Sequence, residues 1–268
     1  MTGREFELLL FSTDPGFIVP AVEAGVSGII VDWEHIGKEG RQTSADTQIN
    51  YDTADDLARV RRSTAASVIC RINGFGGHTP GEVEQAVAAG IDELLLPMVR
   101  SASEVEGVLR MAGGRCRVGI LVETLAAIGA CQELGNLPLS RVYVGLNDLA
   151  IERGERNIFR AVVDGTVERI RGCFNVPFGF GGLTMPDRGR PIPCRLLMGE
   201  MARLGCSFSF LRRSFWNDVG RDELGKGVSA IREAIAKSAG RGADAVEKDR
   251  AELAGCINAW DGSRMGPA

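Results

Sequence analysis

Short apolar segments alternate with helix-like segments along almost the whole chain, and this alternation constrains the fold more than any other feature. Eight segments have the length and composition of buried strands: 6–11, 28–34, 67–73, 93–98, 117–123, 141–148, 177–183 and 208–215. The helix-like segments lie near 17–24, 53–65, 80–89, 102–112, 125–134, 158–171, 195–204 and 222–238. Such alternation predicts an α/β fold with a parallel sheet, because each crossover helix covers one face of the strands.

The number of strand–helix units distinguishes between the two main α/β architectures. Eight units in about 250 residues match a (β/α)8 TIM barrel. The alternative is an open doubly wound sheet, but the first predicted strand lacks the G-x-G-x-x-G turn of a dinucleotide-binding version. We therefore predict a TIM barrel over residues 1–240 and an extra C-terminal helical segment at 241–268. The stretch near 244–259 is predicted to be a helix that packs on a neighbouring subunit, with a solvated tail as the alternative.

Composition limits the partners and the location. The 31 basic and 35 acidic residues give a formal net charge of −4, which offers no attraction for nucleic acid or an anionic membrane surface. The seven cysteines are scattered and form no C-x-x-C pair, so neither a disulfide framework nor a zinc site is indicated. No basic-then-apolar signal peptide opens the chain, and no apolar run approaches the ~20 residues of a membrane span. A cytoplasmic protein with small-molecule partners is expected.

Polar side chains stand where several predicted strands end. In a (β/α)8 barrel the working groups lie at the carboxyl ends of the strands. The second predicted strand ends with Asp32 and Glu34 on one face, and the third ends near Arg71. The fifth and sixth end in Glu123 and Asp148. We expect all five side chains to face the barrel mouth.

Glu123 and Asp148 are one strand–helix unit apart and suit a divalent cation. Mg²⁺ typically takes one or two carboxylates together with water or substrate oxygens. Zinc fits less well, because the chain has only 2 histidines and no thiolate cluster. The structural alternative is that either carboxylate caps the following helix or pairs with Arg71.

Five short motifs occur in order at these strand ends. They are Val31-Asp32-Trp33-Glu34-His35, Arg71-Ile72-Asn73-Gly74, Leu96-Pro97-Met98-Val99 with Ser101-Ala102, Val122-Glu123-Thr124 and Gly145-Leu146-Asn147-Asp148-Leu149. Over about residues 6–215 this pattern resembles the metal-dependent HpcH/HpaI aldolase and citrate lyase family. That family contains class II pyruvate aldolases and belongs to the phosphoenolpyruvate/pyruvate superfamily.

The resemblance implies a role for each matched residue. Glu123 and Asp148 correspond to the carboxylates that bind Mg²⁺ or Mn²⁺. Arg71 corresponds to the arginine that holds the 2-oxo oxygen, and His35 to the histidine that moves protons in the aldolase branch. Asp32 is a further catalytic candidate that either orients His35, caps a backbone group or pairs with Arg71.

The activity implied by the resemblance is carbon–carbon bond cleavage or formation through the metal-bound enolate of a 2-oxo acid such as pyruvate or oxaloacetate. Arg71 would stabilise the enolate oxygen, and His35, or a metal-bound water that it orients, would exchange a proton with the substrate hydroxyl. The second substrate would be an aldehyde, an oxo acid or an acyl-CoA. The resemblance also implies a homo-oligomer, a trimer or hexamer assembled through C-terminal helices.

The motifs mix two branches of the family, so two further functions stay open. Asn147 before Asp148 is similar to the citrate lyase branch, whereas the Glu34-His35 pair is similar to the aldolase branch. The alternatives are a Claisen-type acyl-CoA lyase or citrate synthase-like enzyme, and a metabolite-binding barrel without turnover.

Several other residues are predicted to contact the substrate. Gly145, Leu146 and Asn147 follow the sixth predicted strand, and Arg212 stands near the end of the eighth. The arginines of segment 184–191 are predicted either to form a charged surface loop or to receive a second substrate.

Overall fold

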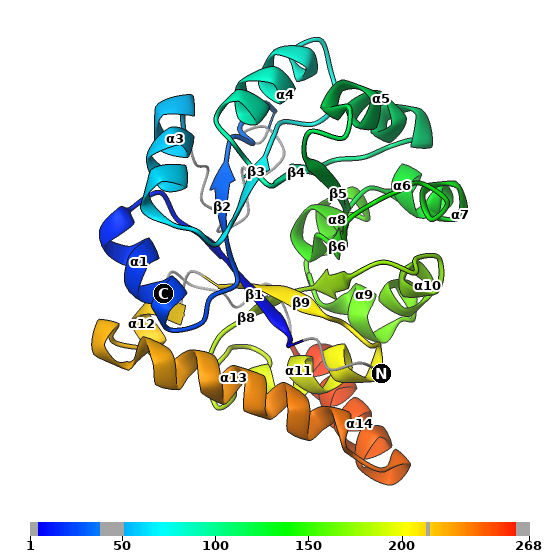
Figure 1. The fold of residues 1–268 in the computed structure, drawn as a ribbon. Helices are drawn as coiled ribbons and strands as arrows, with labels where there is room; N and C mark the ends of the chain where they lie inside the picture. The colour runs from blue at the N-terminus through cyan, green and yellow to red at the C-terminus, as the bar shows by residue number, and fades with distance from the viewer. Residues whose placement is uncertain (1–4, 38–50, 213–214, 261–268) are drawn as a thin grey trace.

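The computed structural model describes residues 5–37, 51–212 and 215–260 and contains a parallel sheet surrounded by helices (Figure 1). The strands of the described ranges are β1 (Glu7–Phe11), β2 (Gly28–Asp32), β3 (Ser67–Arg71), β4 (Glu93–Leu96), β5 (Arg117–Val122), β6 (Val142–Val144), β7 (Phe178–Phe180), β8 (Gly182–Leu183) and β9 (Phe208–Leu211). Their order is β7-β6-β5-β4-β3-β2-β1-β9-β8, and every neighbouring pair is parallel.

Helices connect the strands and form the outer layer. They are α1 (Pro15–Glu23), α3 (Ala54–Ser63), α4 (Thr79–Ala88), α5 (Ala102–Ala112), α6 (Leu125–Gly129), α7 (Cys131–Leu134), α8 (Leu146–Glu152), α9 (Arg160–Val163), α10 (Thr166–Gly172), α11 (Cys194–Arg203), α12 (Phe215–Asp218), the 3₁₀ turn η1 (Arg221–Glu223), α13 (Leu224–Ala239) and α14 (Ala243–Ala259). None of the helices in the described ranges is both long enough and apolar enough to cross a membrane.

The sheet curls into a nearly closed TIM-type barrel, which confirms the predicted fold class. The seventh predicted strand is divided into β7 and β8 at Gly181, whose φ of 58° lies in the left-handed region that interrupts a strand. The last strand bonds to both pieces: the Ser207 amide donates to the Phe178 carbonyl at 3.0 Å, and the Arg212 amide donates to the Leu183 carbonyl at 2.7 Å.

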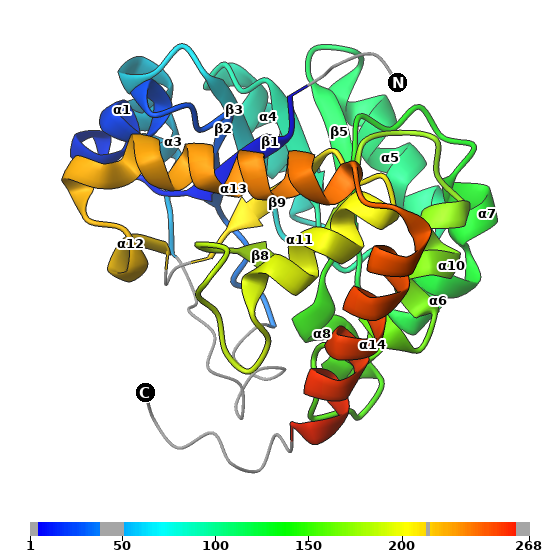
Figure 2. The same cartoon turned by 90° about the horizontal axis from the view of Figure 1, so that it is seen from below.

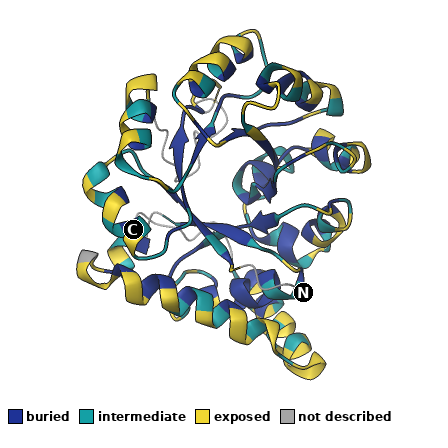
Figure 3. Cartoon of the chain, viewed as in Figure 1, coloured by how far each residue is buried: buried dark blue, intermediate teal, exposed yellow. Residues whose placement is uncertain are grey.

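Alternate strand residues face the inside and the outside of the barrel, as the two-residue period of a strand requires. The interior holds a cluster of Leu9, Ile30, Ile69, Leu95, Leu121, Tyr143, Phe208 and Phe210. The opposite strand faces join the larger core under the helices, so the strands are buried on both sides (Figure 3). Cys70 belongs to this outer core, because it precedes the inward-facing Arg71 by one residue.

The predicted C-terminal helical segment is present as α13 and α14, and α14 packs on its own barrel. Its buried side chains are Leu253 and Ile257. It contacts α9 and α11, and Figure 2 shows it beside α11. The Asn157 side-chain amide donates to the Ile257 carbonyl at 2.8 Å. Contact with a neighbouring subunit remains a prediction, and residues 261–268 of this predicted segment lie outside the described residues.

Candidate active site

The inward-facing positions change from apolar to ionic at the carboxyl ends of the strands. Asp32, Arg71 and Glu123 each stand two residues beyond a member of the apolar interior cluster. Asp32 and Arg71 are also paired in register between β2 and β3. Because residues two apart on a strand share a face, the structure brings these three predicted side chains to one mouth.

Arg71 is held by two buried carboxylates. Its Nε and Nη2 atoms donate to the two Asp32 oxygens at 2.8 and 2.7 Å, and Nη1 lies 3.2 Å from Glu34 Oε2. Burial opposes the charge of the guanidinium, but the charges of Asp32 and Glu34 outweigh it and raise the pKa of Arg71 above its usual range. The structure therefore shows two of the three roles considered for Asp32: the ion pair with Arg71, and a backbone cap in which the Glu34 amide donates to Asp32 Oδ1 at 3.2 Å.

An aromatic floor lies beneath this ionic layer. The Arg71 guanidinium lies over the Phe11 ring at 5.0 Å from its centroid. Phe11 meets Phe210 edge-on at 5.3 Å, and Tyr143 stacks on Phe210 at 3.8 Å. These rings close the barrel interior below the mouth, so a ligand above them is shielded from water on one side.

Glu123 is buried with only 2% of its surface exposed. Its Oε1 accepts a hydrogen bond from the Met98 amide at 2.8 Å. Met98 has a φ of 53°, a backbone conformation that non-glycine residues rarely adopt and that is often found at functional sites. Burial, followed by the charges of Asp148 and Glu34, raises the pKa of Glu123 well above its usual range.

Asp148 lies near Glu123 but not at a strand end, which corrects the sequence-based placement. Strand β6 ends at Val144, and Asp148 lies in the first turn of α8. The apolar spacing of Leu146, Leu149 and Ala150 is typical of a helix and was the signal for this change. Asp148 is 8% exposed, and its charge acts on Glu123, so the predicted carboxylate pair is retained.

Gly145, Leu146 and Asn147, at the start of α8, differ in burial and in their distance from Glu123. Gly145 precedes the helix, and a Cβ atom there would lie 2.0 Å from Glu123 Oε2, so only glycine permits the observed carboxylate position. Leu146 is buried in the outer core, and Asn147 is half-buried. Gly145 therefore touches the site directly, whereas Leu146 packs against the helical layer.

His35 is exposed just beyond β2 and its ring is oriented by the backbone. Its Nδ1 lies 2.8 Å from the Trp33 carbonyl, and only a protonated nitrogen can bond to that oxygen. The neutral ring therefore carries its lone pair on Nε2. The backbone amides of His35 and Ile36 donate to Asn73 Oδ1, and Glu82 accepts from the Asn73 amide. Asn73 and Glu82 position this turn, a role that was not predicted.

Arg212 follows β9 and is half-buried. Its Nε donates to the Gly182 carbonyl at 2.7 Å, and its guanidinium lies 5.9 Å from the Phe159 ring centroid. By contrast, Arg188 and Arg190 are exposed on the loop between β8 and α11, in agreement with the surface-loop alternative. The predicted strand over 208–215 includes residues 213 and 214, which lie outside the described residues.

The mouth contains carboxylate oxygens of the kind that a hard cation prefers. Its ionic side chains are Asp32, Glu34, Glu123 and Asp148 against Arg71 and Arg212. Glu123 with Asp148 supplies the oxygen donors that Mg²⁺ prefers. No group of three or more His, Cys, Asp or Glu side chains in the described ranges could hold a metal ion, so water or substrate would have to complete the shell.

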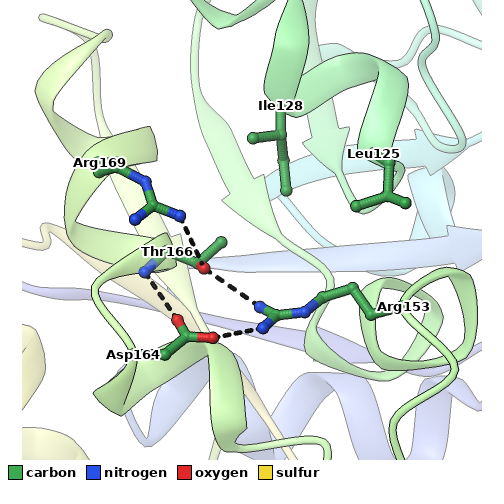
Figure 4. A pocket seen from close by; sticks show the side chains of 6 residues that line it. All are labelled: Leu125, Ile128, Arg153, Asp164, Thr166 and Arg169. Carbon is green, nitrogen blue, oxygen red and sulfur yellow. Dashed lines mark hydrogen bonds and ion pairs between the residues drawn. The ribbon is translucent and has the colours of Figure 1, made fainter.

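Two surface pockets lie away from the strand ends. One of about 230 Å³ is lined by α6, the end of α8 and the start of α10 (Figure 4). Its Arg153 pairs with Asp164, and Thr166 Oγ1 accepts from both Arg153 and Arg169 at 3.1 and 3.2 Å. The other, of about 520 Å³, lies at the amino end of β5. Since the arginines of the first pocket are already bonded, the barrel mouth remains the stronger candidate.

Comparison with known proteins identifies the fold. No protein-family model and no curated protein matches the sequence. An HpcH/HpaI aldolase from Desulfitobacterium hafniense DCB-2 has a TM-score of 0.61 at 15% identity over 85% of this chain and 93% of that chain. Citrate synthase SbnG has a TM-score of 0.56 at 16% identity, over 78% of this chain and 86% of that chain. RipC from Yersinia pestis has a TM-score of 0.56 at 15% identity, over 90% of this chain and 98% of that chain. The chain therefore has the fold of the HpcH/HpaI aldolase and citrate lyase family, as its strand-end motifs predict.

Proposed function

We propose that this protein is a divalent-metal-dependent carbon–carbon lyase or aldolase that acts through the enolate of a 2-oxo acid of the pyruvate or oxaloacetate type. One observation carries the proposal: Arg71, held by two buried carboxylates, shares a mouth with the buried pair of Glu123 and Asp148. The fold shared with an aldolase and a citrate synthase supports it.

Glu123 and Asp148 are the residues that would hold the cation, Mg²⁺ or Mn²⁺. When bound, such an ion supplies a Lewis acid that favours enolate formation. Burial and neighbouring charge raise the pKa of Glu123, and a cation between the carboxylates would relieve that repulsion. The Met98 amide holds one Glu123 oxygen and leaves the other to face Gly145.

Arg71 is the group that would bind the 2-oxo oxygen. A guanidinium has five N–H donors, and the bonds to Asp32 and Glu34 occupy three of them. The remaining donors have no partner among the residues that the structure describes and would stabilise the negative charge that develops on the enolate oxygen. The two carboxylates fix the plane of the guanidinium, so this stabilisation needs no rearrangement during the reaction.

His35 is the proton acceptor in the cleavage direction. Its Nε2 lone pair would take the proton of the substrate hydroxyl, that oxygen would become a carbonyl, and the C–C bond would break. The electron pair of that bond would stay on the 2-oxo acid fragment as its enolate. In the bond-forming direction, His35 would return the proton to the new hydroxyl.

Exchange of the C3 protons of pyruvate with deuterated water tests the proposal, because it reports enolisation without the second substrate. We expect exchange with Mg²⁺ or Mn²⁺, loss of exchange in EDTA, and loss in Glu123→Ala. Glu133→Ala, an exposed glutamate of α7, is the matched control and should keep the wild-type rate. Exchange that survives EDTA or Glu123→Ala would overturn the metal assignment. A wild-type protein that shows no exchange with either ion would favour a binding barrel without turnover.

A Claisen-type reaction with an acyl-CoA is the second candidate. It is favoured by Asn147 before Asp148 and by the shared fold with a citrate synthase. A CoA ester present at 100 times its dissociation constant should stabilise the protein by about 2.7 kcal/mol, which a thermal-shift assay detects.

We also propose that the protein forms a trimeric or hexameric homo-oligomer and is located in the cytoplasm. Light scattering would test the oligomeric state, and cell fractionation would test the location.

A further inference from the structure

Two cysteines that are distant in the sequence are neighbours in the fold. Cys131 begins α7, in the crossover between β5 and β6, and Cys173 ends α10, in the crossover between β6 and β7. The two helices lie side by side in the outer layer (Figure 1, Figure 2). The Cys131 and Cys173 side chains are in hydrogen-bond contact. The side-chain amide of Gln132 also donates to the Cys173 sulfur, at 3.3 Å.

Gly135 lets the last turn of α7 approach Cys173 closely. A Cβ atom at this position would overlap the Cys173 carbonyl oxygen and would lie 3.3 Å from the Cys131 carbonyl oxygen. The backbones of both cysteines therefore meet at a residue that has no side chain. Because these contacts are with backbone atoms, which cannot rotate away as the end of a side chain can, the close approach is a fixed property of the fold.

The two thiols differ in their access to solvent. Cys131 is buried in the outer core with 4% of its surface exposed, whereas Cys173 is half-buried. Burial, followed by the neighbouring Cys173, raises the pKa of Cys131 to about 12. Cys131 is therefore a protonated thiol at neutral pH, and a reagent that arrives from solvent meets Cys173 first.

We infer that Cys131 and Cys173 are a redox-active thiol pair, which hydrogen peroxide converts to an intramolecular disulfide. The inference is independent of the proposed function, because neither thiol belongs to the barrel mouth. The disulfide would join the two crossovers that flank β6. Since cytosolic thiols are kept reduced, the bond would be a reversible modification in that compartment and not a permanent link.

The chemistry takes two steps. In the first, the Cys173 sulfur attacks one oxygen of the peroxide, so that an S–O bond forms and the O–O bond breaks. The other oxygen leaves as water with the thiol proton, and Cys173 becomes a sulfenic acid. In the second, the Cys131 sulfur attacks the Cys173 sulfur, the S–S bond forms and the S–O bond breaks, and the hydroxyl group leaves as water with the Cys131 proton. The two thiols lose two electrons together, and one peroxide is reduced to two waters.

Peptide mapping tests the inference, because trypsin separates the two cysteines. Residues 118–141 form one tryptic peptide, with Cys131 as its one cysteine, and residues 172–188 form another, with Cys173 as its one cysteine. We expect the reduced full-length protein, treated with hydrogen peroxide and then alkylated, to give these peptides joined, with the loss of two hydrogen atoms. Dithiothreitol should separate them.

Single variants distinguish the two steps. Cys131→Ala removes the second thiol, so the Cys173 sulfenic acid should accumulate and be trapped by dimedone. Cys173→Ala should give neither the joined peptides nor a dimedone adduct on Cys131, because the Cys131 thiol is buried. Cys256→Ala, at a half-buried cysteine of α14, is the matched control and should give the same joined peptides as the wild type.

Melting temperatures provide a second measurement. Oxidation should raise the melting temperature of the wild type by about 5–15 °C, because the bond closes a loop of about 40 residues, and dithiothreitol should reverse the rise. The melting temperature of Cys131→Ala should not rise. The reduced variants are compared in the same way to show that they are folded, and Cys173→Ala keeps the test decisive if Cys131→Ala is not.

Oxidised wild-type protein without the joined peptides would overturn the inference. Disulfides between molecules, or between either cysteine and another thiol in preference to this pair, would overturn it as well. Joined peptides that form together with a lower melting temperature would show that the bond requires a distorted fold, which would contradict the placement of the two thiols in this structure.

Discussion

Gly145 illustrates at the scale of a single residue how little freedom the mouth has. A Cβ atom there would lie 2.0 Å from Glu123 Oε2 and 3.0 Å from Glu123 Cβ. Both contacts are with a buried side chain that the Met98 amide already holds. Any larger residue must therefore displace the carboxylate that we propose as a metal ligand.

Gly145→Ala is expected to slow the C3 exchange of pyruvate by at least about 10-fold, because displacements of about 1 Å in a catalytic site have effects of this size or larger. Overpacking should also lower the free energy of unfolding by about 1–3 kcal/mol. Gly129→Ala in α6 is the control: no atom lies within 4 Å of its Cβ position, so the exchange rate should not change. Wild-type exchange in Gly145→Ala would show that the position of Glu123 does not matter for activity.

The buried charges around Arg71 have a positional role at this same scale. Removing two ions from water costs about as much as their attraction returns, so a buried pair is weak evidence for stability. Asp32 and Glu34 instead fix the plane of the guanidinium. That explains why carboxylates occupy interior positions where the rest of the barrel uses aliphatic and aromatic residues.

At the scale of elements, helix α3 begins with a reciprocal capping box. Thr53 Oγ1 accepts from the Asp56 amide at 3.2 Å, and Asp56 Oδ2 accepts from the Thr53 amide at 2.7 Å. The hydrogen bond from the Thr53 side chain is the largest influence that lowers the pKa of Asp56 below its usual 3.8. The cap is therefore strongest when Asp56 is ionised.

Thr53→Ala should lower the free energy of unfolding by about 0.5–2 kcal/mol at pH 6. A carboxyl with a depressed pKa stabilises the fold above its unfolded value and loses that contribution as the pH falls through its folded value. The difference between the variant and the wild type should therefore shrink from about pH 3.8 downward. Denaturant titrations at pH 6 and pH 3 measure it, and a difference that does not depend on pH would contradict the role of Asp56.

At the scale of the whole molecule, buried charged side chains lie at both ends of the barrel. At the amino end, Glu93 is fully buried and accepts from Arg141 Nε at 2.8 Å and from Ser140 Oγ at 2.6 Å. The Arg141 guanidinium lies 4.9 Å from the Phe208 ring centroid and 3.1 Å from Glu7. These groups pair with one another at the closed end of the barrel, except that Glu93 Oε2 has no hydrogen-bond partner among the described residues and lies 3.6 Å from Arg117 Nη2.

Arg141→Met should destabilise the protein by about 3–5 kcal/mol, because it leaves the Glu93 carboxylate buried without its main partner. The double variant Arg141→Met with Glu93→Leu should recover most of that loss, since no charge then remains buried. Chemical denaturation of the two variants and the wild type measures both effects. A double variant as unstable as Arg141→Met would show that packing of the arginine, and not its charge, matters.

Much of the fold could be predicted because its determinants are local. The alternation of short apolar strands with helices, the two-residue period within each strand and the polar residues after β2, β3 and β5 are all properties of neighbouring residues. They determined the barrel, the strand faces and the set of side chains at the mouth. The change from strand to helix before Asp148 was missed, although the helical spacing was present in the sequence, because Leu146 continues the two-residue apolar period of Val142 and Val144 past the end of β6.

Only the tertiary structure decided how those side chains pair. Asp32 and Arg71 lie 39 residues apart, and Asn73, whose side-chain Oδ1 accepts from the His35 amide, is 38 residues from His35. Whether Asp32 binds Arg71 or orients His35, and whether Arg212 finds a counter-ion, depends on distances and burial across the barrel. The sequence by itself determined which charged groups reach the mouth, because side-chain direction follows from local backbone geometry. The tertiary structure decided which of them are paired and which remains available, because electrostatic pairing depends on separation in space.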